Sequence, residues 1–190
     1  MSQTEYENFN KKLAFHSAPT LLGIKCASLI SLLSDEFEIA YHSRMFNEKA
    51  CVKGLKTRIL CQCKSRSLMF VYNERLLAKR LSDVEISEML MGCGYPSDAS
   101  IEENLEFLAA RIKACNDFPH EIGIFLDYPI EDVKGFIKNK GENFKLCGFW
   151  KVYGSEEKAK KTFLNYKKCR NFLCGKLNEG IDIYKALRIS

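Results

Sequence analysis

Two short β-prone runs joined by three polar residues limit the folds open to this chain more than any other feature. The runs cover residues 56–63 and 67–73, and Lys64, Ser65 and Arg66 connect them. Such a short connection requires antiparallel pairing, because parallel strands need a crossover of a dozen or more residues. The second run is almost wholly apolar, which predicts a central strand.

Helical patterns surround this hairpin. Thr4 is a predicted N-cap with Glu7 at capping-box spacing, and the first helix should end near His16 because Pro19 disfavours helical geometry at Ala18. We predict helices over 4–15, 35–53, 74–81, 84–91, 101–115, 130–138 and 156–177, and further strands over 26–33 and 145–153. His42 is expected on the surface of its helix and Phe172 in the core. The caps expected for the helices that start at 35, 74 and 84 are Ser34, Asn73 and Ser82-Asp83.

The order of these elements does not alternate strand with helix as a doubly wound fold does. It predicts an α+β protein: a small, mainly antiparallel sheet of about four strands packed with about seven helices. With 190 residues, 46% of them hydrophobic, the chain is long enough to bury a sizeable core. We expect residues 1–190 to form a single domain.

The first residues carry neither a basic start nor an apolar core, and no apolar stretch reaches the roughly 18 residues of a membrane span. We therefore expect a cytoplasmic protein with no membrane association. Nine cysteines are then expected to be reduced. Cys61 and Cys63 would share one strand face, where they could hold a metal, react, or serve as small core residues.

The net charge of +5 is modest, and its densest part is the predicted helix 156–177. Lysines scattered over one helix are typical of a solvated face, so nucleic-acid binding is not expected. The same basic helix could instead bind a protein partner.

Two stretches gather the residue types that carry chemistry. His16-Ser-Ala-Pro-Thr-Leu-Leu-Gly-Ile-Lys25 reads as a loop, and Pro119-His120-Glu121 precedes an apolar run. His120 and Glu121 diverge on either a helix or a strand, so His16 is the better partner for acid–base work or for a metal. The candidate catalytic residues are His16, His120 and Glu121.

Other residues could complete a site between these two stretches. Lysines and arginine could form an anion-binding edge, and Trp150 and Tyr153 could stack on a planar ligand or fill the core. The alternative for the second stretch is structural: a short helix with His120 near its N-cap, then a helix opened by Pro129. The candidate ligand-binding residues are Thr20, Lys25, Arg58, Trp150, Lys151 and Tyr153.

Three motifs, His16–Lys25, Phe118–Phe136 and Gly148–Tyr153, occur in an order that resembles an uncharacterised bacterial family, domain of unknown function 3793. The resemblance covers nearly the whole chain. It implies that the three regions belong to one domain, and it implies no activity. Family members carry a cysteine after the first histidine, where this chain has Ser17, so a thiol there is not expected to be essential.

Three functions remain open. The first is a small-ligand-binding protein or enzyme with a pocket between the His16 loop and the His120 loop. The second is a haem or tetrapyrrole-binding protein with His16 or His120 as axial ligand. The third is a non-catalytic adaptor that binds a protein through helix 156–177. No dinucleotide fingerprint, phosphate loop or nucleophile elbow occurs.

Overall fold

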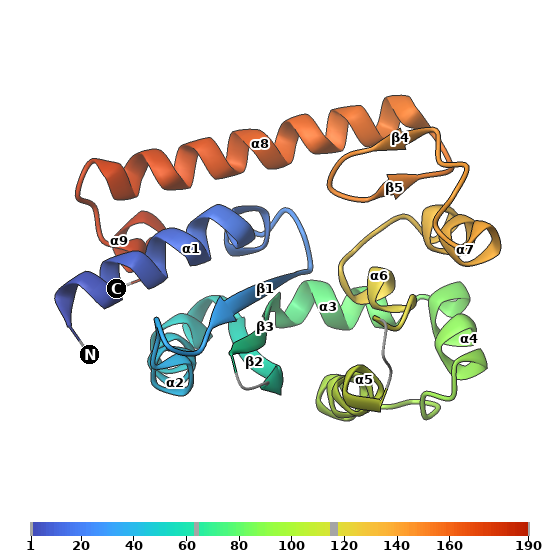
Figure 1. The fold of residues 1–190 in the computed structure, drawn as a ribbon, viewed down its shortest axis with the longest axis horizontal. Helices are drawn as coiled ribbons and strands as arrows, with labels where there is room; N and C mark the ends of the chain where they lie inside the picture. The colour runs from blue at the N-terminus through green and yellow to red at the C-terminus, as the bar shows by residue number, and fades with distance from the viewer. Residues whose placement is uncertain (1, 63–64, 115–117, 190) are drawn as a thin grey trace.

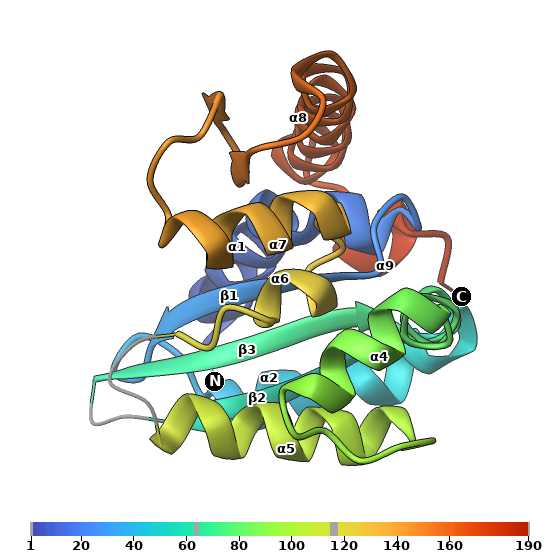
Figure 2. The same ribbon diagram turned by 90° about the vertical axis from the view of Figure 1, so that its right-hand side faces the viewer.

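A three-stranded antiparallel sheet divides the computed structural model, which describes residues 2–62, 65–114 and 118–189. Its strands are β1 (Ala27–Leu33), β2 (Leu55–Gln62) and β3 (Arg66–Asn73), in the order β1-β3-β2. Figure 2 shows β3 between its two neighbours. The predicted hairpin and the central position of its second strand are confirmed, as is the α+β class.

The apolar run in β3 is explained by burial on both faces. Met69 and Val71 contribute to one hydrophobic core, whereas Phe70 and Tyr72 contribute to the other. Side chains alternate across a strand, so each face of β3 supplies a different core. In β2 the register shifts between Ile59 and Cys61, which breaks the alternation predicted there.

Helices α1 (Gln3–Leu21), α2 (Ile39–Ala50) and α9 (Ile183–Ala186) cover one face of the sheet, and a 3-10 turn (Cys51–Lys53) follows α2. The opposite face carries five helices (Figure 1). These are α3 (Glu74–Leu81), α4 (Val84–Gly92), α5 (Ile101–Ala114), α6 (Ile122–Phe125) and α7 (Ile130–Asn139). The predicted caps Asn73 and Asp83 accept hydrogen bonds from Leu76 N and Ile86 N, respectively.

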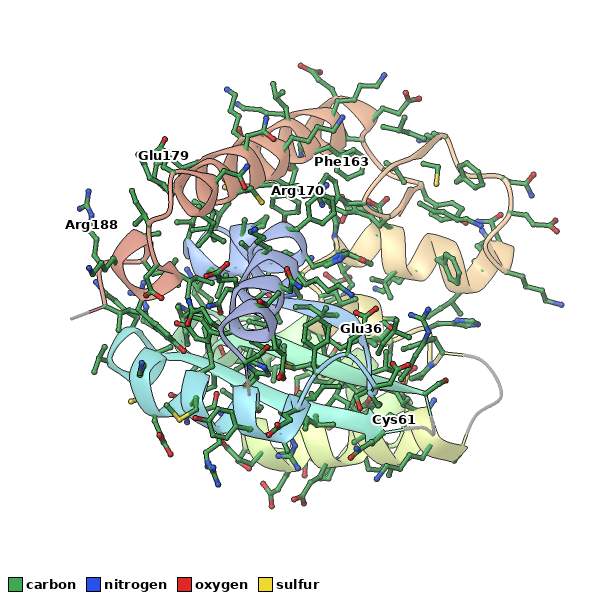
Figure 3. All side chains as sticks on the ribbon, turned by 60° about the vertical axis from the view of Figure 1, so that its left-hand side comes forward. Glu36, Cys61, Phe163, Arg170, Glu179 and Arg188 are labelled. Atoms are coloured by element: carbon green, nitrogen blue, oxygen red, sulfur yellow. The ribbon has the colours of Figure 1, made fainter. Side chains whose placement is uncertain are left out.

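The long helix α8 (Glu156–Asn178) runs across both halves, from the hairpin of β4 (Leu146–Cys147) and β5 (Lys151–Val152) to α9 (Figure 1). Together with the hairpin it buries a third cluster, which includes Trp150 and Phe163. Figure 3 shows Phe163 and Arg170 on the side of α8 that faces the rest of the molecule. In the described residues the helices number nine, against about seven predicted.

The first helix does not end near His16. It begins after Ser2, whose hydroxyl accepts from Glu5 N at 3.1 Å, and it continues to Leu21. Pro19 lies in its last turn and its carbonyl accepts from Ile24 N at 2.8 Å, which closes the helix end. Burial of Ala18 and Leu21 in the first core outweighs the local preference against a helix before proline.

The second helix starts later than predicted, at Ile39 rather than at Asp35. The Ser34 hydroxyl meets that of Ser67 at 3.3 Å instead of capping a helix. His42, expected at the surface, is 3% exposed. Its ring stacks on Phe9 with centroids 4.0 Å apart, so the helix turns this histidine into the core.

Two expectations about the C-terminal third were wrong. Residues 145–153 do not form one strand, because β4 and β5 are separate two-residue strands joined by a tight turn. Phe172, expected in the core, is 52% exposed. Among the described residues, no helix is both long and apolar enough to span a membrane.

Of the predicted pair Cys61 and Cys63, only Cys61 lies among the described residues. Cys61 is half-buried. In the described part of the chain, no group of three or more histidine, cysteine or acidic side chains is placed to hold a metal ion.

Candidate functional site

An apolar pocket of about 280 Å³ lies where α6, α7 and the β4–β5 hairpin meet. Aromatic and aliphatic side chains form most of its wall, and three polar residues contribute to it. The lining residues are Phe118, Pro119, His120, Ile122, Gly123, Tyr128, Asp132, Val133, Phe136, Trp150 and Lys151. A pocket with this mixture, mainly apolar with few polar groups, is typical of small-molecule sites.

Two glycines allow the elements around the pocket to approach closely. A Cβ added at Gly135 of α7 would lie 2.5 Å from the Tyr153 side chain, and one at Gly148 would lie 2.2 Å from Phe163. Side chains cannot be accommodated at such distances without movement. The glycines therefore set how tightly the hairpin packs against α7 and α8.

Asp132 holds the hairpin to α7. It is 2% exposed, and its Oδ2 accepts from the Trp150 indole at 2.7 Å while Oδ1 accepts from the amides of Tyr153 and Gly154, both at 2.7 Å. Three N–H donors compensate the buried carboxylate charge. The same bonds fix Trp150 in the pocket wall, where Tyr128 stacks on it at 5.1 Å.

His120 and Lys151 both lie next to Phe136, at the more exposed part of the pocket. The ring centroids of His120 and Phe136 are 5.2 Å apart. Lys151 Nζ donates to the Gly141 carbonyl at 2.7 Å and lies 5.8 Å from the Phe136 centroid. These two side chains give an otherwise apolar pocket a basic rim.

Arg80 of α3 holds the turn that carries Tyr128 into the pocket. Its guanidinium donates to the carbonyls of Ile124 at 3.4 Å and Tyr128 at 2.5 Å, and it forms an ion pair of 3.7 Å with Asp127. Asp127 has a positive φ of 62°. Arg80 thus stabilises a backbone conformation at Asp127 that residues other than glycine rarely adopt.

His16 does not contribute to this pocket. It lies on the exposed side of α1, beside Phe15, and partial burial together with Arg170 and Lys12 lowers its pKa. Residues 16–21 of the expected loop belong to α1, and the predicted site between a His16 loop and His120 is not the arrangement that the structure shows. The pocket contains His120 without His16.

Glu121 points away from His120. Its Oε1 pairs with Arg111 of α5 and accepts from the Tyr95 hydroxyl at 3.3 Å. Glu121 is 3% exposed, and this carboxylate, together with burial as the larger cause, raises the pKa of Tyr95. The predicted divergence of the two neighbouring side chains is therefore seen, with Glu121 in a buried ion pair.

The other predicted binding residues are divided between the pocket, the core and a partly exposed ion pair. Trp150 and Lys151 line the pocket. Tyr153 sits beside it on the hairpin, and its buried hydroxyl has no hydrogen-bond partner among the described residues.

Thr20 is buried and shares a hydrogen bond of 2.8 Å with Ser28, so it serves the core. Arg58 pairs with Glu106 of α5 at 3.2 Å.

Lys25 is buried away from the pocket, with 8% exposure. Its ammonium lies over the rings of Tyr128 and Tyr166, at 5.4 Å and 5.5 Å. Burial lowers the pKa of Lys25 to about 8. Lys25 does not line the pocket; it contacts Tyr128, which does.

The sequence interpretation missed Tyr128, Asp132 and Phe136 as site residues. All three lie in the second half of the Phe118–Phe136 motif, which the sequence interpretation explains as a helix opened by Pro129. The signal that could have found them is the acidic residue at a helix start followed by glycine and aromatic residues, because a buried first-turn aspartate needs N–H donors from elsewhere.

The fold and pocket define an α+β protein with an aromatic-lined cavity between a helix pair and a small hairpin. Comparison with known families then places the chain. Residues 13–187 match the model of a family described as a protein of unknown function (DUF3793), and the chain belongs to this family. No curated protein and no solved structure matched it.

Proposed function

We propose that this protein binds a small ligand with a flat, mainly apolar body in the pocket between α6, α7 and the β4–β5 hairpin. The observation that carries the proposal is the lining: aromatic walls from Phe118, Tyr128, Phe136 and Trp150 around a cavity of about 280 Å³. That volume is close to the lower end of ligand pockets, which begin at roughly 300 Å³. Aromatic walls favour rings through offset stacking and edge contacts.

The polar groups favour binding over catalysis. Asp132 directs both carboxylate oxygens to N–H donors of the hairpin, which leaves it poorly placed to accept a substrate proton. Glu121 is held by Arg111. A general base needs a free acceptor within hydrogen-bond reach of its substrate, and His120 is the only pocket residue that offers one in the described part of the chain.

Haem binding is the second candidate, because His120 lines the pocket and could supply an axial nitrogen. The cavity volume favours a smaller ligand than a tetrapyrrole. Haemin titration tests this candidate directly: a Soret shift that His120→Ala abolishes would support it. A spectrum unchanged by added protein would end it.

Binding of a neutral aromatic probe tests the main proposal. N-phenylnaphthylamine fluoresces when it leaves water, and Trp150 is the only tryptophan in the chain, so energy transfer from its indole reports binding near this wall. We expect a saturable one-to-one titration. Ile122→Phe, which fills the pocket, should weaken binding at least roughly fivefold, since a well-packed site tolerates little added volume.

A matched pair of exposed phenylalanines supplies the control. Phe118 lines the pocket with 48% exposure, and Phe15 lies on α1 with 47% exposure. Phe118→Ala should weaken probe binding, whereas Phe15→Ala should not. Equal losses in both variants, or no saturable binding to a natively folded protein, would contradict the proposal.

A further inference from the structure

Lys151 lies at the rim of the pocket, and its ammonium contacts a backbone carbonyl and no carboxylate among the described residues. We infer that the ligand of the proposed pocket is an aromatic anion, with a carboxylate or similar acidic group that Lys151 binds. The inference rests on the proposed function and adds to it the chemical class of the ligand.

Lys151 has two donors to spare. Its ammonium carries three N–H groups, and the Gly141 carbonyl takes one at 2.7 Å. In the described residues it forms no ion pair with a carboxylate. Phe136 and Phe144 flank the charge at 5.8 Å and 5.0 Å. The ammonium is thus positioned by a neutral acceptor and keeps its full charge for a ligand.

Asp132 does not cancel this charge. Among the described residues it is the only acidic one that lines the pocket, and its two oxygens accept three hydrogen bonds, from the hairpin backbone and the Trp150 indole. Donors that converge on a carboxylate offset its negative charge at short range. An acidic ligand would therefore find Asp132 already bonded to three N–H donors and Lys151 bonded only to a neutral carbonyl.

Phe136 places the polar rim next to an aromatic wall. His120 contacts this ring at 5.2 Å between centroids, and Lys151 Nζ lies 5.8 Å from its centroid. A ring that packs against Phe136 has both basic side chains as neighbours. An apolar body with one acidic group matches both halves of the pocket, whereas a neutral ring leaves the lysine without a counter-ion.

Two probes with the same ring system separate the inference from the proposed function. Anilinonaphthalene sulfonate is N-phenylnaphthylamine with an added sulfonate, so comparison of the two dissociation constants isolates the anionic group. We expect the sulfonate probe to bind tighter, and Lys151→Met to weaken it by roughly three- to tenfold while binding of the neutral probe changes by less than about twofold.

Lys145 provides the matched control. It lies on the same hairpin and donates to a glycine carbonyl, that of Gly154, at 3.0 Å, but it does not line the pocket. Lys145→Met should leave both affinities unchanged. If Lys151→Met fails to fold, salt titration of the wild type replaces it, because raised ionic strength screens only the anionic probe.

The outcomes separate cleanly. Absence of saturable binding by the neutral probe overturns the proposed pocket itself. Neutral binding with no advantage for the sulfonate, or equal losses for both probes in Lys151→Met, overturns the aromatic anion and leaves the pocket standing. A selective loss of sulfonate affinity that salt reproduces establishes the class of ligand.

Discussion

The indole N–H of Trp150 donates a 2.7 Å hydrogen bond to Asp132, which lies 18 positions earlier in the chain. The second oxygen of that carboxylate accepts hydrogen bonds from the backbone amides of Tyr153 and Gly154. One buried side chain on α7 therefore fixes the hairpin backbone and the pocket wall together. These bonds hold the pocket wall in place, and a wall held in place lowers the ordering cost of the proposed binding.

Replacement of Asp132 tests this arrangement. In Asp132→Asn, one oxygen must serve three donors, so the Trp150 indole or the two amides lose their acceptor. We expect the free energy of unfolding to fall by about 2–4 kcal/mol, because charge-assisted hydrogen bonds are lost and buried donors are left unpaired. Chemical denaturation followed by Trp150 fluorescence measures the change.

Asp35→Asn is the control for that substitution, since Asp35 is exposed. It should change the free energy of unfolding by less than about 0.5 kcal/mol. Equal effects at the two aspartates would show that Asp132 does not hold the hairpin.

Two helical glycines should respond to alanine in opposite directions. Gly135→Ala places a Cβ 2.5 Å from Tyr153, whereas a Cβ at Gly175 of α8 meets nothing within 4 Å. We expect Gly135→Ala to lower the free energy of unfolding by about 1–3 kcal/mol through overpacking. Gly175→Ala should raise it by about 0.5–1 kcal/mol through helix propensity.

Thermal denaturation followed by circular dichroism compares the two variants, and probe titration adds a second measurement. Gly135→Ala should also weaken binding of the neutral probe, because displacement of Tyr153 shifts the hairpin. A stabilising effect at Gly135 would refute the close approach of α7 and the hairpin.

The local chemistry of the sequence was sufficient for much of the fold. The hairpin of β2 and β3 follows from a short polar connection, and the caps Asn73 and Asp83 follow from their side-chain oxygens. These features depend on residues a few positions apart. The α+β class followed because it needs only the order of the elements.

The candidate site depends on contacts that the sequence does not specify locally. Pro19 was expected to end the first helix near His16, but the helix continues to Leu21 because the neighbours of Pro19 are buried. His16 therefore lies on an exposed side of α1 and not in the pocket with His120. The partner of Asp132 is in a different element. A pocket assembled from a helix pair and a distant hairpin has no short-range signature beyond aromatic residues, which fill cores equally often.

Glu121, a candidate catalytic residue, is predicted to contribute to stability instead. Glu121→Gln removes the negative partner of Arg111 in a pair whose carboxylate side chain is 4% exposed and whose arginine is 35% exposed. Breaking a buried pair is costly, and the access of Arg111 to water reduces that cost, so we expect a loss of about 1–3 kcal/mol. Neutral-probe affinity should stay unchanged, as measured by titration.

The pair of Arg58 and Glu106 provides the comparison, because Glu106 is 71% exposed. Glu106→Gln should cost less than about 0.5 kcal/mol, since exposed ion pairs contribute little. A Glu121→Gln protein that folds with wild-type stability but loses ligand binding would return Glu121 to the site.

Lys25 gives a prediction about pH. Burial lowers its pKa from 10.5 to about 8, so between these values the unfolded chain binds more protons and this group makes stability rise with pH. Below pH 8 the lysine is charged in both states, and burying its charge lowers the free energy of unfolding by roughly 3 kcal/mol, as the pKa shift implies. Lys25→Met removes this cost, and loss of the contacts with Tyr128 and Tyr166 offsets part of the gain, by about 0.5–2 kcal/mol.

We therefore expect Lys25→Met to be more stable than the wild type at pH 7 by about 1–3 kcal/mol. The difference should shrink as the pH rises from 8 toward 10.5, because the wild-type lysine then becomes neutral in both states. Urea denaturation of both proteins across this range measures it, and subtraction removes the buried tyrosines and cysteines, which titrate in both. Lys167→Met, at an exposed position of α8, should give a difference that does not vary with pH. A constant difference for Lys25→Met would mean that Lys25 keeps its ordinary pKa in the folded protein.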